Sequence, residues 1–600
     1  MLGLAYSVAI PLGEAPDEAD HLAYAAYIAQ TQRLPQGAEM TQAKHPPLYH
    51  VLAAAVGGWA GLGAGFLRAN PDVGFTSDAS PNFFVHTTVE SWPWRDGPLA
   101  MRLARLVSVL AGVGLVAATY ALGRAVWPSW PNGALAAAIF VAFLPESLFV
   151  GGAMSNDTLA ALLGTLALWL ALRSRTPWHA VITGIVMGLG LWAKVSVAAL
   201  WPVVCLVMLA QGWAAGGWRR TLRPRVWGLT AIAGLVALAV TAPWFLRNRQ
   251  LYGDWMGWPL VLATIDRRAG PFGLAELAWL LRGLFLSFWG KFGGAGHIAL
   301  PWSFYALWGV LVAVAGLGGV RQIADCKWQI GKSANHKSAN HKSADHKSAD
   351  QCDDRVSRFT FDVSLILFGA PLMTLVWLIV YSRVALGTDQ GRLLFPAIGP
   401  LALLLVRGLA GANCKLQIAN CKSANLYAHQ PMNVILCAWC GLLFMVAVAA
   451  LTFGLALPFA APLAPSGVEV AAAQPVGRTF GDVIELVSYR WEPEARQPDK
   501  RQLILYWRAV RPVTTDLRAA LRLLDAQGGM IWEWKRSPGA GRFSTDRWPG
   551  GRLVADVYHI PVEHLARAAR IEVGVRPFPE GAWLTLTDGA PTLSLPGSRP

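Results

Sequence analysis

Charged residues are scarce in this chain. Only 14% of its 600 residues are charged, while 54% are hydrophobic. Soluble globular proteins carry roughly 25% charged residues. A deficit of this size, together with a mean hydropathy of +0.39, excludes an ordinary soluble domain for most of the chain and predicts a surface that faces lipid. The 28 Trp agree with this prediction, because indole rings favour the membrane interface.

Cysteine is also scarce, and none of the seven follows Cys440. The C-terminal part is therefore not a secreted disulfide scaffold. A cleavable signal peptide is not expected, because residues 1–12 lack a basic start and a small-residue cleavage site. They are also fewer than the roughly 20 that span a bilayer, so we expect a shortened first helix. The four cysteines of the polar loops have a spacing that matches no zinc-binding pattern: Cys326, Cys352, Cys414 and Cys421.

The net charge of +15 raises the question of nucleic acid. The basic residues lie largely in short loops between apolar runs, as in the tract from Arg219 to Arg225. This is the positive-inside pattern that orients membrane helices. A nucleic-acid partner would instead favour a basic face on a folded domain. We therefore expect membrane lipids, and no nucleic acid, as partners of the basic loops.

Apolar runs long enough to span or nearly span a bilayer recur along the chain. With the short first helix they predict about eleven transmembrane helices. The fold class expected is therefore an α-helical polytopic membrane protein with a separate C-terminal domain. The runs cover residues 100–125, 132–152, 158–172, 178–193, 195–212, 226–246, 302–320, 361–381, 393–408 and 432–458.

Lys and Arg predict the orientation of these helices. Helix counting places four basic loops on one side, which we assign as cytoplasmic: 173–175, 218–225, 321–358 and 407–431. The first long loop (14–98), the loops 247–301 and 382–392 and the C-terminal domain then lie outside the cell membrane. Arginines on the outer side break the inside rule and are candidates for binding an anion, with interfacial snorkelling as the alternative. They include Arg102, Arg105, Arg247 and Arg392.

The domain organisation follows from changes in composition. Residues 1–460 form the multispanning domain, with low-complexity cytoplasmic insertions at 321–358, which repeats KSANH, and at 409–431. Such repeats cannot build a core. Residues 461–475, rich in Ala and Pro, form a linker. Residues 476–600 show short alternating apolar stretches with regular turns, which predicts an all-β sandwich of six to eight strands with a hairpin at 525–529.

The first outer loop holds the most informative pattern. It reads APDEADHLAYAAYIAQTQRLP from Ala15 and KHPPLYHVLAAAV from Lys44. Asp17, Glu18 and Asp20 stand in the first turn of an expected helix, where carboxylates interact well with the helix dipole. Helix capping alone would account for them, but ionised pairs beside lipid are costly unless they are used. The helix should lay an apolar face along the membrane, formed by Leu22, Tyr24, Ala25 and Ile28.

This loop, and the segments after it, resemble the GT-C glycosyltransferases. These multispanning enzymes use polyprenyl-phosphate sugars and include bacterial protein O-mannosyltransferases and lipid A aminoarabinose transferases. The resemblance covers most of residues 1–460, through the order and placement of motifs rather than any single one. The further matching segments are RLARLVSVLAG from Arg102, AMSNDTLAALLG from Ala153, LWAKVSVAALWP from Leu191, PWFLRNRQLYGD from Pro243 and DQGRLLFPAIGP from Asp389.

The resemblance implies a catalytic assignment. Asp17 matches the proposed aspartate base, and Glu18 matches the second acid of the pair. A hydroxyl acceptor needs a carboxylate to take its proton as it attacks the anomeric carbon. A lipid phosphate is already a good leaving group, so a single base with inversion is the economical mechanism. The donor would be a polyprenyl-phosphate sugar, and protein, lipid and glycan acceptors all fit.

The lipid phosphate needs cations near the outer surface. Lys194, Arg247, Arg249 and Arg392 are the candidates, because such side chains bind phosphate and are costly beside lipid. Arg392 is the first choice, since Gln390-Gly391-Arg392 begins a helix whose N–H groups favour anions. The alternative is that each cation pairs with an acid such as Asp157, Asp254 or Asp389. Asn156 and Asp157 begin another outer helix and are candidates for binding substrate; the alternative is that Asn156 caps the helix and Asp157 interacts with its dipole. His21 and His45 complete the expected substrate contacts.

Departures from the family pattern leave some points open. The acids read D-E-A-D rather than DxD, so a divalent cation stays open and no other cofactor is expected. The irregular stretch Asn70–Gly97 could cover the active site. The competing functions are a transporter of a lipid-linked sugar, which would need charges deep in its helices, and a non-catalytic scaffold whose sandwich binds surface polymer. An enzyme of the cell envelope, a glycosyltransferase for hexoses or pentoses, is the leading interpretation.

Overall fold

The computed structural model describes residues 1–74, 80–214, 224–339, 363–412, 430–493, 497–579 and 581–596. Residues 340–358 and 413–429 of the low-complexity tracts predicted at 321–358 and 409–431 lie outside these residues. The chain divides into two compact units. A helical unit holds Met1–Ile10, Asp17–Gly63 and Ala100–Leu455, and a sandwich unit holds Pro11–Pro16, Ala64–Leu99 and Ala456–Pro600.

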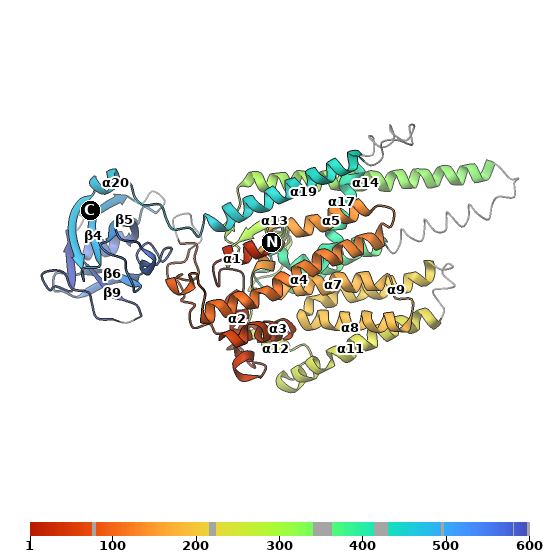
Figure 1. Cartoon of the computed structure of the whole chain (residues 1–600), viewed down its shortest axis with the longest axis horizontal. Coiled ribbons are helices and arrows are strands. Elements are labelled where there is room, and N and C mark those ends of the chain that lie inside the picture. The colour runs from red at the N-terminus through yellow and green to blue at the C-terminus, as the bar shows by residue number, and fades with distance from the viewer. Residues whose placement is uncertain are drawn as a thin grey trace. The chain divides into compact units, whose positions relative to one another are not determined.

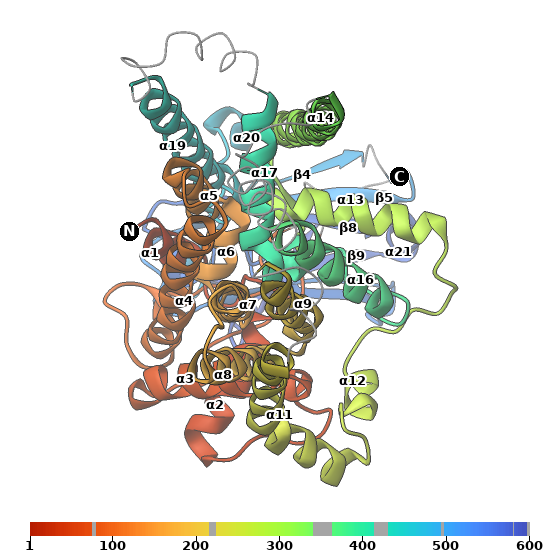
Figure 2. The same ribbon diagram turned by 90° about the vertical axis from the view of Figure 1, so that its right-hand side faces the viewer.

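Every apolar run expected from the sequence forms helix. The long helices of the helical unit run side by side in Figure 1. Figure 2 shows α7 and α14 end-on, whereas α13 is seen lengthwise. The first outer loop supplies two shorter helices, α2 and α3. The helices are α1 (Leu2–Ala9), α2 (Glu18–Thr31), α3 (Leu48–Gly57), α4 (Asp96–Val126), α5 (Pro131–Phe143), α6 (Pro145–Gly152), α7 (Asp157–Ala171), α8 (Pro177–Ala193), α9 (Trp201–Ala214), α11 (Pro224–Tyr252), α12 (Trp258–Ala263), α13 (Leu274–Gly290), α14 (Trp302–Ala339), α16 (Ala370–Ser382), α17 (Ile398–Ala412) and α19 (Gln430–Ala450).

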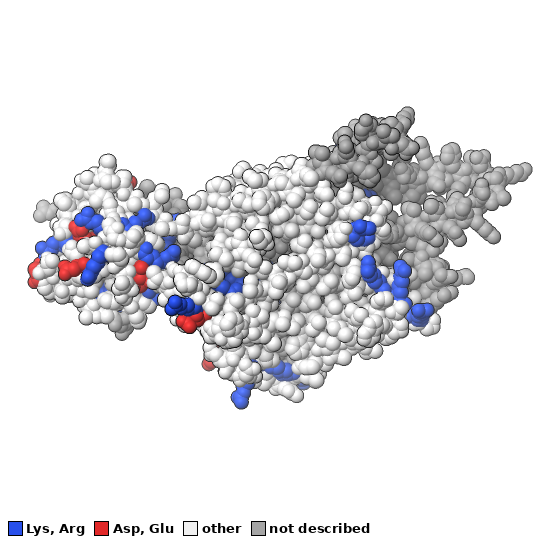
Figure 3. Space-filling view, viewed as in Figure 1, with Lys and Arg blue, Asp and Glu red and all other residues white. Residues whose placement is uncertain are grey.

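Six of the described helices are long and apolar enough to cross a membrane, or up to seven if the bent pair α5–α6 is one span. Four apolar helices of 10–17 residues accompany them. Figure 3 shows the middle of the helical unit almost free of charged side chains on the visible face, as a lipid-facing band requires. The chain is a multi-pass membrane protein, and the expected count of eleven spans stays a prediction.

Several predicted runs are single in the sequence but break or change helix type in the structure. The run 132–152 bends by 55° between α5 and α6. Pro145 has no N–H and disfavours a helical residue before it, and Leu144 is accordingly extended, with φ −65° and ψ 118°. The run 195–212 begins as a 3-10 helix, η4 (Val195–Leu200), before α9. These breaks bring irregular backbone to the helix ends.

The sandwich unit holds two four-stranded sheets, in the orders β10-β9-β6-β7 and β3-β4-β5-β8, with every strand pair antiparallel. Alternating residues of each sheet point into one core, around the buried Trp507 and Trp548. The predicted all-β C-terminal fold is therefore confirmed. Its strands are β3 (Gln474–Phe480), β4 (Ile484–Pro493), β5 (Lys500–Ala509), β6 (Leu517–Leu524), β7 (Met530–Arg536), β8 (Leu553–Pro561), β9 (Arg570–Pro577) and β10 (Thr592–Leu595).

The predicted hairpin at 525–529 joins β6 to β7, where Gly528 N donates to Asp525 O. Part of the first outer loop also belongs to this unit. Arg68 forms an ion pair with Asp516, and Asn70 Nδ2 donates to Ala540 O at 3.0 Å. The stretch predicted to cover the active site thus packs on the sandwich, and its role as a cover stays a prediction. The domain boundaries at 460 and 475 also remain predictions.

Candidate functional site

Asp17 stands immediately before α2, at the helix N-cap. It was expected inside the first helical turn, together with Glu18 and Asp20. The structure corrects this: Asp17 has φ 59°, in the left-handed region, and its side chain accepts no capping bond. A non-glycine residue held in that region costs conformational energy and is often found at functional sites. The turn leaves its side chain 45% exposed, whereas the chain on either side is buried.

Arg392 joins two acidic side chains that are far apart in the sequence. Its Nη2 lies 2.5 Å from Asp17 Oδ2, and its Nη1 lies 2.7 Å from Asp157 Oδ2. Lys194 Nζ forms an ion pair with the other oxygen of Asp157. Two cations and two carboxylates therefore alternate in one network, which we call the Asp17–Arg392 cluster (Asp17, Asp157, Lys194 and Arg392). Lys194 and Arg392 therefore both pair with Asp157, as the alternative interpretation of the sequence expected.

The position of Arg392 depends on close packing of its neighbours. Arg392 lies in η6 (Gly391–Ala397), directly after Gln390. Gln390 Oε1 accepts a bond of 2.7 Å from Arg392 Nε. Gly391 N donates to Ser287 Oγ of α13 at 2.6 Å, and a Cβ at this glycine would lie 2.2 Å from Phe288 N. Only glycine permits this approach, which fixes the start of η6 against α13.

Asn156 and Asp157 begin α7 as expected, but the capping role assigned to Asn156 is wrong. Its side chain accepts no bond from the helix; its Nδ2 instead donates to Ala193 O at 3.2 Å. That carbonyl immediately precedes Lys194, so the bond joins the start of α7 to the end of α8. Asn156 and Asp157 are both about 1% exposed. Asn156 therefore positions Lys194 rather than touching solvent.

Glu18 has a different environment from its neighbour Asp17. Its two oxygens accept bonds of 2.8 Å each from Nε and Nη2 of Arg105, and Met154 N donates a third bond at 2.8 Å. Both side chains are 0% exposed. Arg105 also donates to the carbonyls of Ser7 and Ile10 in the first helix region. This geometry favours a structural role for Glu18 and gives the outer-side Arg105 a protein partner.

His21 and His50 of the first loop lie in a buried aromatic stack. His21 Nδ1 and His50 Nε2 are 2.9 Å apart, and the ring of His50 stacks on Tyr24 with centroids 3.9 Å apart. Burial lowers the pKa of His21 to about 4, although Asp17 raises it. Burial also lowers the pKa of His45. The face of α2 expected along the membrane is buried in protein instead: Leu22, Tyr24, Ala25 and Ile28.

Charges around Asp17 set its protonation. Loss of surrounding water alone would raise the pKa of its carboxyl, but the charge and hydrogen bond of Arg392 and the charge of Lys194 lower it below its usual range. Lys44 is a further cation here, which the sequence reasoning missed. Its charge interacts with Asp17, Asp20 and Lys194, and its Nζ donates to Thr264 O at 3.1 Å. The signal available was its place at the head of the KHPPLYH motif.

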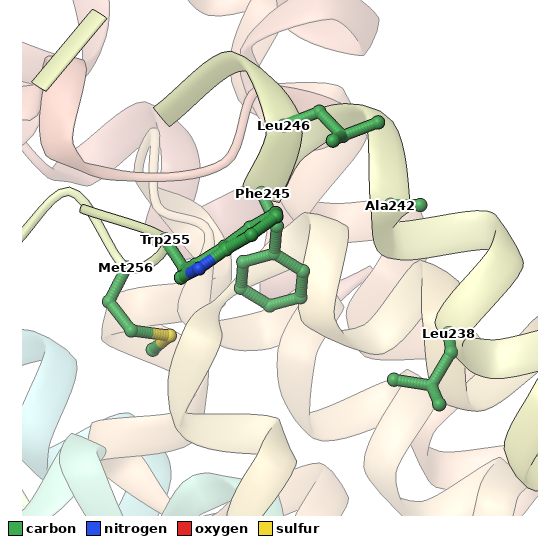
Figure 4. Close-up of a pocket in the computed structure, with 6 residues that line it drawn as sticks. All are labelled: Leu238, Ala242, Phe245, Leu246, Trp255 and Met256. Carbon is green, nitrogen blue, oxygen red and sulfur yellow. The ribbon is translucent and has the colours of Figure 1, made fainter. Parts of the chain in front are cut away.

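Arg247 lies apart from the Asp17–Arg392 cluster in its bonding. Its Nη2 donates to Pro35 O at 2.7 Å. Together with Tyr27, Arg33, Leu34 and Gln36 it lines a polar recess of about 530 Å³. A second, apolar pocket of about 440 Å³ follows α11. Figure 4 shows Trp255 and Phe245 side by side in it, with Leu238 at its other end.

A metal site has little support among the described residues. No group of three or more His, Cys, Asp or Glu side chains in them is placed to hold an ion. His21 and His50 bond to each other, and Asp17 and Asp157 bond to Arg392. Among the described residues, no set of ligands is therefore placed for the divalent cation that the sequence left open.

Comparison with known proteins gives structural neighbours only. No family model matches the chain, and no curated protein matches its sequence. The crystal structure of ArnT from Cupriavidus metallidurans, bound to undecaprenyl phosphate, is similar over 76% of this chain and 71% of that one, at 13% identity and a TM-score of 0.38.

The oligosaccharyltransferase of Archaeoglobus fulgidus, solved with Zn and sulfate, is similar over 78% of this chain at 13% identity and a TM-score of 0.39. This chain spans 54% of that protein's length. Both neighbours have TM-scores below 0.5. At these TM-scores they carry no argument about chemistry, for which the Asp17–Arg392 cluster itself is the basis.

Proposed function

We propose that this protein is a membrane glycosyltransferase that moves a sugar from a polyprenyl-phosphate donor to an acceptor hydroxyl at the outer membrane face, with inversion. The observation that carries the proposal is the half-exposed Asp17 carboxylate, bonded to the buried Arg392. Arg392, Lys194 and Lys44 supply cationic groups around a carboxylate that substrate can reach.

Asp17 is a weak base while Arg392 holds it, because the ion pair stabilises its charged form. A donor phosphate would compete for the guanidinium, which binds phosphate as well as carboxylate. Neutralising Arg392 in this way raises the affinity of Asp17 for a proton. The carboxylate then accepts the proton of the acceptor hydroxyl as that oxygen bonds to the anomeric carbon and the lipid phosphate leaves. Donor binding would thus activate the base.

The remaining residues support this assignment. Asp157 holds Arg392 and Lys194 in place from its buried position. The apolar pocket along α11 is suited to part of a polyprenyl chain, because aromatic and aliphatic side chains line it. His21 and His45 lie beside the cluster as neutral groups that could contact the acceptor or sugar. Glu18, paired with Arg105, holds the loop rather than reacting.

The test is mass spectrometry of surface glycans from cells that express the protein or its Asp17→Asn variant. Loss of a general base lowers the rate by about 10²–10⁴-fold, so we expect the glycan product to disappear while the folded protein remains in the membrane. Asp20→Asn is the matched control, since Asp20 forms no ion pair in the cluster among the described residues, and it should keep most of the product. Unchanged product with Asp17→Asn would remove Asp17 as the base. Passage of labelled sugar across vesicles without covalent product would favour a transporter.

A further inference from the structure

One sheet of the sandwich unit carries an excess of arginine on its outer face. Along β6, Leu517, Ala519, Leu521 and Leu523 are buried, and the residues between them point away from the core. Along β9, Ile571, Val573 and Val575 are buried in the same way. The register of β6 with β7 and β9 extends this outer face. We call it the β6–β9 face; it consists of Arg518, Ala520, Arg522, Leu524, Glu533, Lys535, Arg570, Glu572, Gly574 and Arg576.

The acidic residues of the β6–β9 face do not neutralise it. Glu533 is bonded to Arg522 at 2.7 Å and to Lys535 at 2.8 Å. Glu572 accepts a bond from the Thr592 hydroxyl at 3.3 Å. Arg518 and Arg576 are direct cross-strand partners, and in the described part of the unit neither forms an ion pair. Like charges directly opposite each other destabilise a sheet, so this pair opposes folding.

Aromatic rings hold these guanidinium groups. The Arg518 guanidinium lies 4.1 Å from the centre of the Phe578 ring, and that of Arg576 lies 5.4 Å from a ring centre of Trp583. Cation–π contacts of this kind orient arginine while leaving its N–H groups available. The guanidinium groups of Arg518 and Arg576 are therefore held in fixed positions on a rigid sheet, as a preformed anion site requires.

Trp583 lies over the smallest pair of residues on the face. A Cβ at Gly574 would meet the six-membered ring of Trp583 at 2.8 Å, and Ala520 is the cross-strand partner of Gly574. The Arg522 guanidinium lies 4.5 Å from a ring centre of the same tryptophan. Trp583 is only half-buried. A flat, partly exposed indole between arginines is suited to a planar or ring-shaped anionic ligand.

We propose that the β6–β9 face binds an acidic glycan, with its carboxylates on Arg518 and Arg576 and a sugar ring against Trp583. Arginine forks bind carboxylates through two parallel hydrogen bonds. An anionic membrane fits less well, because surface helices and patches that enter lipid need exposed apolar side chains. The large exposed apolar residues Val510 and Trp534 are not members of the face, and the exposed Met530 stands only at its edge, opposite Leu524 and far along the strands from Arg518 and Arg576. The proposal goes beyond the transfer reaction and does not depend on Asp17.

The experiment measures binding of hexagalacturonate, a carboxylate-bearing oligosaccharide, to the full chain in detergent by calorimetry. We expect binding that weakens with salt, and no comparable binding of neutral maltohexaose. The double variant Arg518→Gln/Arg576→Gln should bind at least tenfold more weakly. Its melting temperature should stay the same or rise, because the cross-strand repulsion is gone; a purely structural pair would lower it.

The matched control is Lys500→Gln/Arg501→Gln, which removes two positive charges from β5 in the other sheet. It should bind hexagalacturonate as the parent does, and so should Asp17→Asn. Equal weakening in the control would mean that overall charge alone drives binding, and would overturn the proposal. Unchanged binding by the Arg518/Arg576 variant would also overturn it, as would tighter binding to phosphatidylglycerol vesicles or single-stranded DNA that needs the same arginines.

Discussion

Both units bury an arginine against aspartate, but only one of these networks reaches water. In the sandwich unit, Arg536 Nη2 lies 2.7 Å from Asp556 Oδ1, and the two side chains are 6% and 0% exposed. In the helical unit, Arg392 is equally buried, yet Asp17 at the end of its network is 45% exposed. A closed network holds strands together. An open one keeps a carboxylate accessible to a substrate, which is the difference that separates a site from a structural pair.

The same contrast occurs between two consecutive residues of the helical unit. Asp17 and Glu18 look equivalent in the sequence, and each is paired with an arginine. Glu18 and Arg105 are completely enclosed, so their bonds act only on folding. Substitutions at the two positions should therefore separate stability from activity.

The largest effect should come from Glu18→Ala. It leaves Arg105 charged and buried without its partner, which costs about 3–5 kcal/mol. Asp17→Asn should change the free energy of unfolding by about 1 kcal/mol or less, because its ion pair is partly exposed to water. Unfolding of both variants by denaturant in detergent measures the difference. Equal destabilisation by the two substitutions would contradict the division between a structural and an accessible carboxylate.

The two units should also respond to pH in opposite directions. Burial opposes a charge on His86, but its bonds to Glu14 and Glu90 dominate and raise its pKa to about 9. Its contribution is therefore complete below pH 6.5, the ordinary histidine pKa, and is lost as pH rises through 9. Burial lowers the pKa of His21 to about 4, so the helical unit loses stability as pH falls from 6.5 towards 4. Each shift corresponds to about 3 kcal/mol.

Hydrogen exchange of each unit across pH 4–10 measures both trends. His86→Gln should flatten the alkaline loss in the sandwich unit alone, and His21→Gln should flatten the acid loss in the helical unit alone. A parallel pH response of the two units would show that the surroundings of the two histidines do not differ as described.

The sequence predicted elements better than contacts, for physical reasons. A long apolar run predicts a helix directly, and alternating apolar and polar residues predict a half-buried strand. Both the helical part and the β part of the fold could therefore be predicted. Arg392, Lys194 and Asp17 were chosen because charge beside lipid is costly, and Asp157 was named as a possible partner of the cations, but nothing local shows that all four side chains meet. The face of α2 was assigned to lipid because apolar side chains pack equally well against lipid and protein. Asn156 was assigned as a cap because its donation to a distant carbonyl leaves no local pattern.

The smallest effect we predict concerns Gln390, which touches the cluster without carrying charge. Gln390→Ala removes the acceptor of Arg392 Nε but leaves Arg392, Asp17 and Asp157 in place. A hydrogen bond to a charged group contributes about 1.5–3 kcal/mol, and partial replacement by water should reduce the loss of transfer activity to about tenfold. The matched change in the sandwich is Ser544→Ala, which removes a bond of 2.8 Å to Asp516 in a completely buried position. It should lower stability without altering transfer by the folded protein. If Gln390→Ala instead lowered stability and left activity unchanged, the open network around Arg392 would be structural, like the closed one around Arg536.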